Sequence, residues 1–121
     1  MKDFLDIQKD KVLYTNDYFF IIEDGFPVSP GHLLIISNVV KADYFSLTED
    51  EKHGLVETIE VAKLIILEKW KPDGFNIGMN CGEAAGQTVF HFHCHLIPRY
   101  KGDTENPRGG VRYCIPEKGD Y

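Results

Sequence analysis

The chain has 121 residues, a formal net charge of -6 and a sequence pI near 5.3. Its size predicts a single domain over residues 1–121 with a C-terminal tail from about residue 99, and its apolar share of 43% is ordinary for a globular protein. The acidic balance argues against nucleic-acid and anionic-membrane partners, and the lack of any signal-peptide-like or bilayer-length apolar run leads us to expect a cytoplasmic protein.

Residues 18–23 and 32–37 are the two clearest predicted strands. Both are rich in aromatic and β-branched residues, which fit a pleated, half-buried surface. The glycines and prolines between them mark a loop, so a hairpin is the simplest arrangement. A shorter strand over residues 12–14 precedes them.

A long amphipathic helix is predicted next. Thr48 and Glu51 match a capping box at its start. Pro72 and Gly74 prevent its continuation, so the helix should end near Trp70. The apolar residues that share one helical face are Leu55, Ile59, Ala62 and Ile66.

Further strands are expected over residues 75–80 and 88–97, separated by a tight loop over residues 81–86 with two glycines and two alanines. The tail from residue 98 is polar and turn-rich, with residues 111–113 expected to be extended. Together these elements predict an α+β domain, in which one long helix packs on an antiparallel sheet of five or six strands.

Three histidines, His91, His93 and His95, alternate in the last predicted strand. Residues i, i+2 and i+4 of a strand point to the same face, so the three imidazoles should line one surface. Imidazole is the side chain best suited to exchange protons or attack an electrophile near neutral pH. The pattern therefore predicts an active site. The residues that should face the core instead are Phe92, Cys94 and Leu96.

The central histidine, His93, is the candidate nucleophile. A neutral imidazole attacks through one nitrogen only when the other keeps its proton, and a backbone carbonyl would hold that proton without adding charge. The flanking imidazoles, Gln87, Thr88 and the N–H groups of loop 82–86 offer donors to an anion. A phosphoryl group fits this set of donors better than a carbonyl group does.

A metal site is the sharpest alternative. Three histidines in line on one strand cannot all converge on one ion, so zinc would require two of them and a ligand from elsewhere, such as His32. The three cysteines contain no C-x-x-C pair. We therefore expect no metal site, while a zinc-dependent hydrolase stays an open alternative. His53, on the predicted helix, is expected to be solvated.

The segment over residues 86–99, GQTVFHFHCHLIPR, closely resembles the signature of the histidine triad family, and the likeness extends to residues 29–35 and 76–82. It covers roughly residues 18–99. Members of this family are nucleotide hydrolases and transferases that act at an α-phosphate. The resemblance implies that His93 forms a covalent nucleotidyl-histidine intermediate, which water then hydrolyses. The residues implied to orient it, hold phosphate oxygens, assist the leaving group or extend the cluster are His91, His95 and His32.

The same resemblance implies a nucleotide site. Asp24 would accept hydrogen bonds from the ribose hydroxyls, although it could instead only begin a turn with Gly25. Asn80 would contact the phosphates, although it could instead only cap its strand. Further phosphate contacts would come from Gln87 and Thr88, and walls of the pocket from Ile22 and Phe26. No cofactor of the protein itself is implied, and the substrate could carry Mg²⁺.

The residues around the triad, Gln87-Thr88 before it and Ile97-Pro98-Arg99 after it, look more like the branch of fragile histidine triad proteins and bacterial dinucleoside-polyphosphate hydrolases. We therefore expect a hydrolase of dinucleoside polyphosphates. The alternatives are a nucleoside phosphoramidase and a purine-nucleotide-binding regulatory protein with little turnover.

Two further expectations concern the tail and the assembly. Arg108 and Arg112 could neutralise distal phosphates or be solvated charges on a mobile tail. The resemblance implies a homodimer with one continuous ten-stranded sheet, and the helix over residues 55–70 and the strand over residues 75–80 are the candidate interface.

Overall fold

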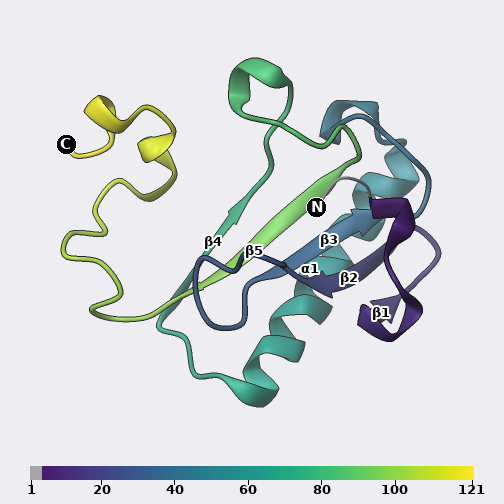
Figure 1. Cartoon of the computed structure of the whole chain (residues 1–121), viewed down its shortest axis with the longest axis horizontal. Coiled ribbons are helices and arrows are strands. Elements are labelled where there is room, and N and C mark those ends of the chain that lie inside the picture. The colour runs from purple at the N-terminus through teal and green to yellow at the C-terminus, as the bar shows by residue number, and fades with distance from the viewer. Residues whose placement is uncertain (1–3) are drawn as a thin grey trace.

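A computed structural model describes residues 4–121; residues 1–3, which the single-domain prediction also covers, lie outside the described residues. The chain forms a five-stranded antiparallel sheet in the order β1-β2-β3-β5-β4 (Figure 1). This confirms the predicted α+β class. The strands are β1 Val12–Thr15, β2 Phe19–Glu23, β3 Leu33–Ser37, β4 Gly74–Gly78 and β5 His93–Arg99.

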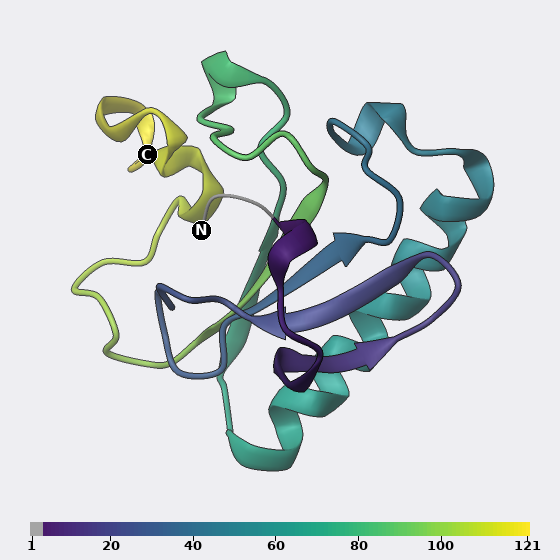
Figure 2. The ribbon, with the colours of Figure 1, turned by 45° about the vertical axis from the view of Figure 1, so that its right-hand side comes forward.

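One long helix, α1 Glu49–Lys69, covers one face of the sheet (Figure 2). Its start is the predicted capping box: the Glu51 N–H donates to Thr48 Oγ1 at 3.1 Å, and the Thr48 N–H donates to Glu51 Oε1 at 2.8 Å. It ends at the predicted place, with Trp70 as its C-terminal cap. Among residues 4–121, no helix is both long enough and apolar enough to cross a membrane.

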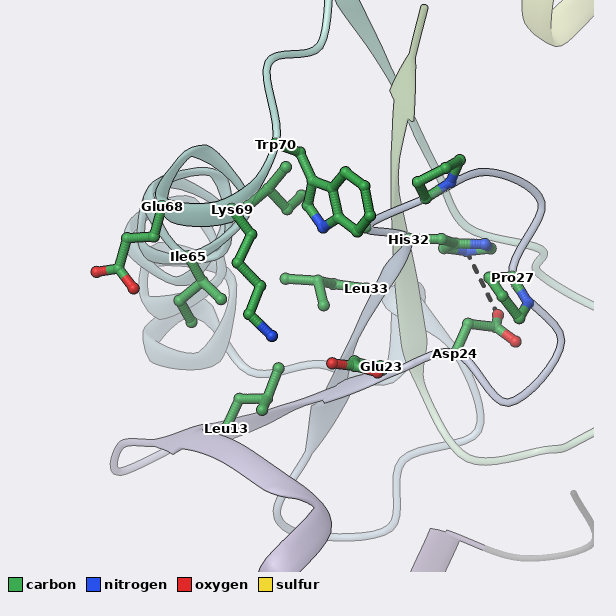
Figure 3. Close-up of a pocket in the computed structure, with 13 residues that line it drawn as sticks. Leu13, Glu23, Asp24, Pro27, His32, Leu33, Ile65, Glu68, Lys69 and Trp70 are labelled. Carbon is green, nitrogen blue, oxygen red and sulfur yellow. Dashed lines mark ion pairs between the residues drawn. The ribbon is translucent and has the colours of Figure 1, made fainter. Parts of the chain in front are cut away.

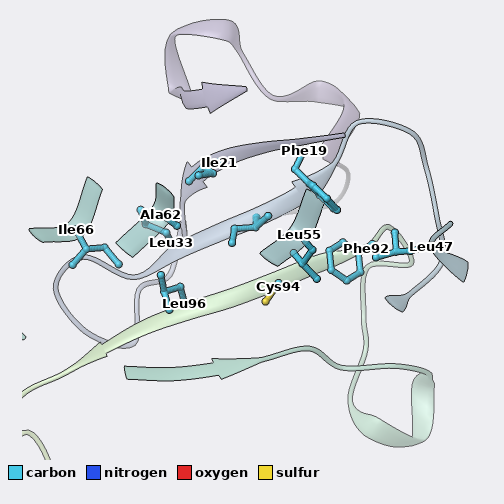
Figure 4. Packing of buried hydrophobic residues seen from close by; sticks show 11 residues of the cluster. Phe19, Ile21, Leu33, Leu47, Leu55, Ala62, Ile66, Phe92, Cys94 and Leu96 are labelled. Carbon is cyan, nitrogen blue, oxygen red and sulfur yellow. The ribbon is translucent and has the colours of Figure 1, made fainter. Parts of the chain in front are cut away.

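The core lies between α1 and the sheet (Figure 4). The prediction that Phe92, Cys94 and Leu96 turn into this core is confirmed, since each is at most 2% exposed. A smaller apolar cluster lies on the opposite face of the sheet, where no long helix covers it. Its buried members, from the N-terminal segment and from β2 and β3, are Phe4, Ile22, Leu34 and Ile36.

The histidine strand starts later than predicted. β5 begins at His93, and residues 88–92 are irregular. Its two neighbouring strands explain the difference: the last pairings before this point are Ile36 of β3 with His93 and Gly78 of β4 with His95. Before His93 only one further bond to β3 remains, from the Ser37 N–H to the Phe92 carbonyl at 3.3 Å, and β4 offers no partner, so the ladder stops here.

The end of the chain, residues 106–121, forms a small folded segment that we call the C-terminal unit. It contains two short 3₁₀ helices, η5 Gly110–Cys114 and η6 Pro116–Lys118, so the predicted extended conformation of residues 111–113 is wrong. Gly109 and Gly110, with φ of +98° and +49°, turn the chain here into a conformation that a β-branched residue would resist.

The side chains of both arginines, Arg108 and Arg112, contact other residues of the C-terminal unit. Arg112 donates to the carbonyl oxygens of Lys118 at 2.7 Å and Gly119 at 3.3 Å. The guanidinium groups of Arg108 and Arg112 both lie over the Tyr121 ring, 4.8 and 4.7 Å from its centroid. These contacts do not favour the prediction that the two arginines neutralise distal phosphates.

Candidate active site

The nucleophile candidate, His93, is held in one tautomer. Its Nδ1–H donates to the backbone carbonyl of His91 at 2.8 Å, which is the arrangement expected for a neutral attacking imidazole. The proton on Nδ1 leaves the lone pair on Nε2 available. The ring is half-buried, between the edge-on ring of Phe4, with centroids 4.9 Å apart, and that of His95, at 5.5 Å.

The first histidine of the triad, His91, has a different environment. Its ring is 4% exposed, and Nε2–H donates to the Ser37 carbonyl at the end of β3 at 2.7 Å. His91 contacts the same Phe4 ring as His93, in keeping with the prediction that the imidazoles line one surface, but the His91 side chain is buried. Its side chain anchors residues 91–92 to β3, and its carbonyl orients His93. A phosphate contact from its imidazole stays a prediction.

His32 and His95 form the second part of the cluster. The Val28 N–H donates to His32 Nδ1 at 3.0 Å, so the proton of neutral His32 must lie on Nε2. That nitrogen is 2.9 Å from His95 Nδ1 and therefore donates to it. The proton of neutral His95 must then lie on its own Nε2. One backbone amide thus sets the tautomers of both rings.

The carboxylate of Asp24 lies beside this pair. Its Oδ2 is 3.3 Å from His32 Nε2 and 3.8 Å from His95 Nδ1, and Figure 3 shows it directed at the His32 ring. Its Oδ1 accepts from the Phe26 N–H at 2.7 Å. Asp24 therefore does organise the turn that the sequence left as an alternative, while its second oxygen faces the histidines.

Both rings of the pair favour the neutral form. Burial, together with the neighbouring His32 and His93, lowers the pKa of His95 to about 4, and Asp24 opposes this shift only in part. Burial also lowers the pKa of His32, again against the pull of Asp24. Near pH 7 the pair is therefore uncharged.

This shift predicts acid lability. The reference pKa of His95 is 6.5, so on acidification the unfolded chain takes up this proton before the folded protein does. Its contribution to stability is fully present above pH 6.5 and is lost as the pH falls toward 4. After allowance for the partial exposure of the ring, we expect urea unfolding at pH 4.5 to show a loss of about 2 kcal/mol relative to pH 7.5.

The matched variant for this measurement is His95→Gln, which cannot take up a proton. It should lose less stability than the wild type over the same pH range. An equal loss in the two proteins would contradict the lowered pKa of His95.

A cleft of about 910 Å³ opens beside the histidine pair. Asp24, His32 and His95 line it together with Asn80, as does the turn over residues 84–86. A second cleft of about 830 Å³ begins on the other side of Asp24 and includes Ile22, which is otherwise buried. Asp24 also lines a third cleft, of about 590 Å³, so its carboxylate stands where three clefts meet.

The remaining predicted phosphate contacts are placed differently from one another. Asn80 is exposed in the 910 Å³ cleft, and Thr88 is exposed on the loop before β5. Gln87 is 4% exposed, and its carboxamide accepts from the Gly82 N–H at 2.8 Å and donates to the Ala42 carbonyl at 2.6 Å. Gln87 thus holds the glycine loop in shape, and a direct phosphate contact from it stays a prediction.

Two residues near the site gave no signal in the sequence pattern. Phe4 contacts the rings of His91 and His93 from the N-terminal segment. Trp70 lies against Gly31, the residue before His32, and borders the third cleft, of about 590 Å³, behind the hairpin loop (Figure 3). Neither contact could be read from periodicity, because each joins segments far apart in the chain.

Asp24, His32 and His95 together offer the number of donor atoms that a metal site needs. Their donor atoms lie within 4.8 Å of one another, which is close enough for one ion. A histidine that binds a metal through Nε2 carries its proton on Nδ1 and donates it to an acceptor. His32 Nδ1 instead faces the Val28 N–H, itself a donor. The three residues are arranged for hydrogen bonding, and they do not fit a zinc ion.

Comparison with known proteins gives a consistent result. The sequence profile of the HIT domain matches residues 7–102. A bis(5′-adenosyl)-triphosphatase from Dictyostelium discoideum is 32% identical over 100 residues, which are 83% of this chain and 67% of that protein.

Two solved structures are also similar. A HIT family protein from Bacillus anthracis is 39% identical, with a TM-score of 0.72 over 77% of this chain and 66% of that one. A Zn-bound histidine triad family protein from Mycobacterium smegmatis is 32% identical, with a TM-score of 0.70 over 78% of this chain and 69% of that one. The chain thus spans about two thirds of the length of these relatives.

Proposed function

Because the chain belongs to the HIT domain family, we propose that it is a hydrolase that cleaves dinucleoside polyphosphates at an α-phosphate. The observation that carries this proposal is the bond from His93 Nδ1 to the His91 carbonyl, which leaves Nε2 free to attack. In the first step the Nε2–phosphorus bond forms and the bond to the leaving phosphate oxygen breaks. Water then attacks phosphorus, releases the mononucleotide and restores neutral His93.

The histidine pair favours a polyphosphate over a phosphoramidate. With a pKa of about 4, His95 holds no extra proton at neutral pH and offers only its neutral Nε2–H. A hydrogen bond from that group suffices for a leaving polyphosphate, which is stable as an anion. A leaving amine must instead gain a proton, which this pair does not supply at pH 7.

In this proposal, the Mg²⁺ that the substrate carries neutralises the negative charge of its phosphates. Among the described residues that line the 910 Å³ cleft, none is a lysine or an arginine. The backbone N–H groups of the loop 82–86 and the carboxamide of Asn80 are the protein's contribution in this proposal. In this proposal Asp24 Oδ2, the oxygen that faces the histidines, accepts hydrogen bonds from the ribose hydroxyls.

A turnover panel tests this function. Diadenosine tetraphosphate should be cleaved at least about 10-fold more efficiently at pH 7.5 than an adenosine phosphoramidate. The leaving amine of the phosphoramidate must gain a proton, and each unit by which the pH exceeds the pKa of His95 lowers the protonated fraction about tenfold. The ratio should shrink toward pH 5, where His95 begins to protonate. Cleavage of the phosphoramidate should survive a chelator, since that substrate needs no Mg²⁺.

Other outcomes of the panel select the alternatives. Faster cleavage of the phosphoramidate at pH 7.5 would identify a phosphoramidase. Tight binding of adenine mononucleotide in a calorimeter, with no turnover of any substrate, would identify a regulatory nucleotide-binding protein.

A homodimer is the assembly that we propose. β4 is an edge strand of the sheet, and three apolar residues, Val56, Leu64 and Leu67, are exposed on α1. Pairing of two β4 edges would cover both features and satisfy the free backbone groups of the edge. Light scattering should give twice the chain mass of 13.8 kDa.

A substitution separates this interface from the rest of the surface. Leu64→Glu should shift the protein toward the monomer mass, whereas Val40→Glu, at an exposed residue outside α1 and β4, should leave the dimer intact. A wild-type protein that runs as a monomer at all concentrations would rule the proposed dimer out.

A further inference from the structure

Exposed apolar side chains gather around the 910 Å³ cleft. Large contiguous apolar surfaces on a soluble protein mark binding sites, whereas scattered single residues do not. These side chains come from three separate parts of the chain: the hairpin loop, the residue that follows β4, and the C-terminal unit. With their exposed fractions they are Phe26 80%, Val28 72%, Met79 36%, Val111 66% and Ile115 54%.

The C-terminal unit presents its share of this surface on a packed support. Gly119 is buried, and a Cβ there would overlap the ring of Tyr113. The hydrogen bonds of Arg112 and its contact with Tyr121 tie the two ends of the unit together. Val111 and Ile115 are therefore held in place as one wall of the cleft, where η5 contacts β4. Figure 1 shows the unit on the β4 side of the sheet.

The wall formed by Val111 and Ile115 lies in the same cleft as the histidine pair. His32 and His95 line the same cleft, and Asp24 joins it to the 830 Å³ cleft. Both volumes lie within the range of pockets that hold small ligands. A substrate attacked by His93 extends in two directions from the α-phosphorus, so its two ends need two separate spaces.

We infer that the C-terminal unit and Phe26 bind the nucleoside of the leaving group, which is the second nucleoside of a dinucleoside polyphosphate. This inference rests on the proposed hydrolase function and extends it to substrate selection. A nucleobase stacks on an aromatic ring and packs on apolar side chains. The phosphate chain is a poor occupant for this wall, because no lysine or arginine lies among the described residues that line it.

Two substrates that differ only by the second nucleoside test the inference: diadenosine tetraphosphate and adenosine 5′-tetraphosphate. The ratio of their kcat/KM values measures what the second adenosine contributes. Phe26→Ser and the double variant Val111→Ser/Ile115→Ser remove the proposed contacts. The matched controls are Phe45→Ser and Val39→Ser, which alter exposed residues outside the cleft, 76% and 61% exposed.

We expect the ratio to fall about 10-fold in each cleft variant, the effect of losing one stacking or apolar contact of ordinary size. Turnover of adenosine 5′-tetraphosphate should stay unchanged in Val111→Ser/Ile115→Ser. The controls should keep the wild-type ratio. An unchanged ratio in both cleft variants, or an equal fall in the controls, would overturn the inference while leaving the hydrolase intact. A wild type that cleaves neither compound would overturn the proposed function, and the inference with it.

Discussion

Replacement of His93 by alanine should reduce kcat for diadenosine tetraphosphate by about 10⁴-fold or more, the scale seen when a covalent nucleophile is removed. The bond from its Nδ1–H to the His91 carbonyl keeps Nε2 unprotonated, as a nucleophile requires. Steady-state kinetics measure the loss, and calorimetry should show that mononucleotide binding changes little. The control is His53→Ala, because His53 is exposed on α1 and should leave kcat unchanged.

The chemical identity of the intermediate gives a second readout of the same prediction. When the reaction is quenched rapidly with alkali, wild-type protein should carry the mass of one nucleotide on the peptide that contains His93, and acid should remove it. His93→Ala protein should carry none. A nucleotide attached to another residue, or full turnover without any attached nucleotide, would show that His93 is not the nucleophile.

Gly31→Ala should be the most damaging single-methyl change in the hairpin loop. Gly31 has φ of +91°, and a Cβ there would lie 2.9 Å from Trp70 Cδ1 and 3.2 Å from Pro98 Cγ. Backbone strain and overpacking together should lower the free energy of unfolding by about 2–4 kcal/mol. Because His32 follows directly, we also expect activity to fall, by about 10-fold or more.

Two variants divide this effect into its parts. Gly25→Ala lies in the same loop, has negative φ and has no atom within 4 Å of its new methyl group, so it should change stability by about 0.5 kcal/mol or less. Adding Trp70→Ala to Gly31→Ala removes the clash with the indole but leaves the backbone strain. If Gly31→Ala were as harmless as Gly25→Ala, the described packing of the loop would be wrong.

Local signals were enough to predict most of the fold. The capping box of Thr48 and Glu51 depends on residues three apart, and it fixes the start of α1 as expected. The alternation of Phe92, Cys94 and Leu96 with the histidines correctly predicts which side of β5 meets the core. Both are short-range patterns, in which the periodicity of the chain itself carries the information.

The features that were missed depend on contacts between distant segments. β5 starts at His93, near the point where β3 ends at Ser37 and two residues before the last β4 pairing, Gly78 with His95, and a strand pattern in one segment cannot show where its partners stop. The tautomers of His32 and His95 follow from the Val28 amide, a backbone group present at every position of any sequence. The fold of the C-terminal unit likewise depends on Tyr121 reaching back over two arginines.

The position of Trp70 has a practical consequence. It is the chain's single tryptophan, it is 41% exposed, and its indole touches the residue that precedes His32. Tryptophan emission, excited selectively over the six tyrosines, therefore originates beside the hairpin that carries His32. The molecule carries its own optical probe of that hairpin, and an adenine mononucleotide that reorders the loop can be followed by fluorescence without any attached dye.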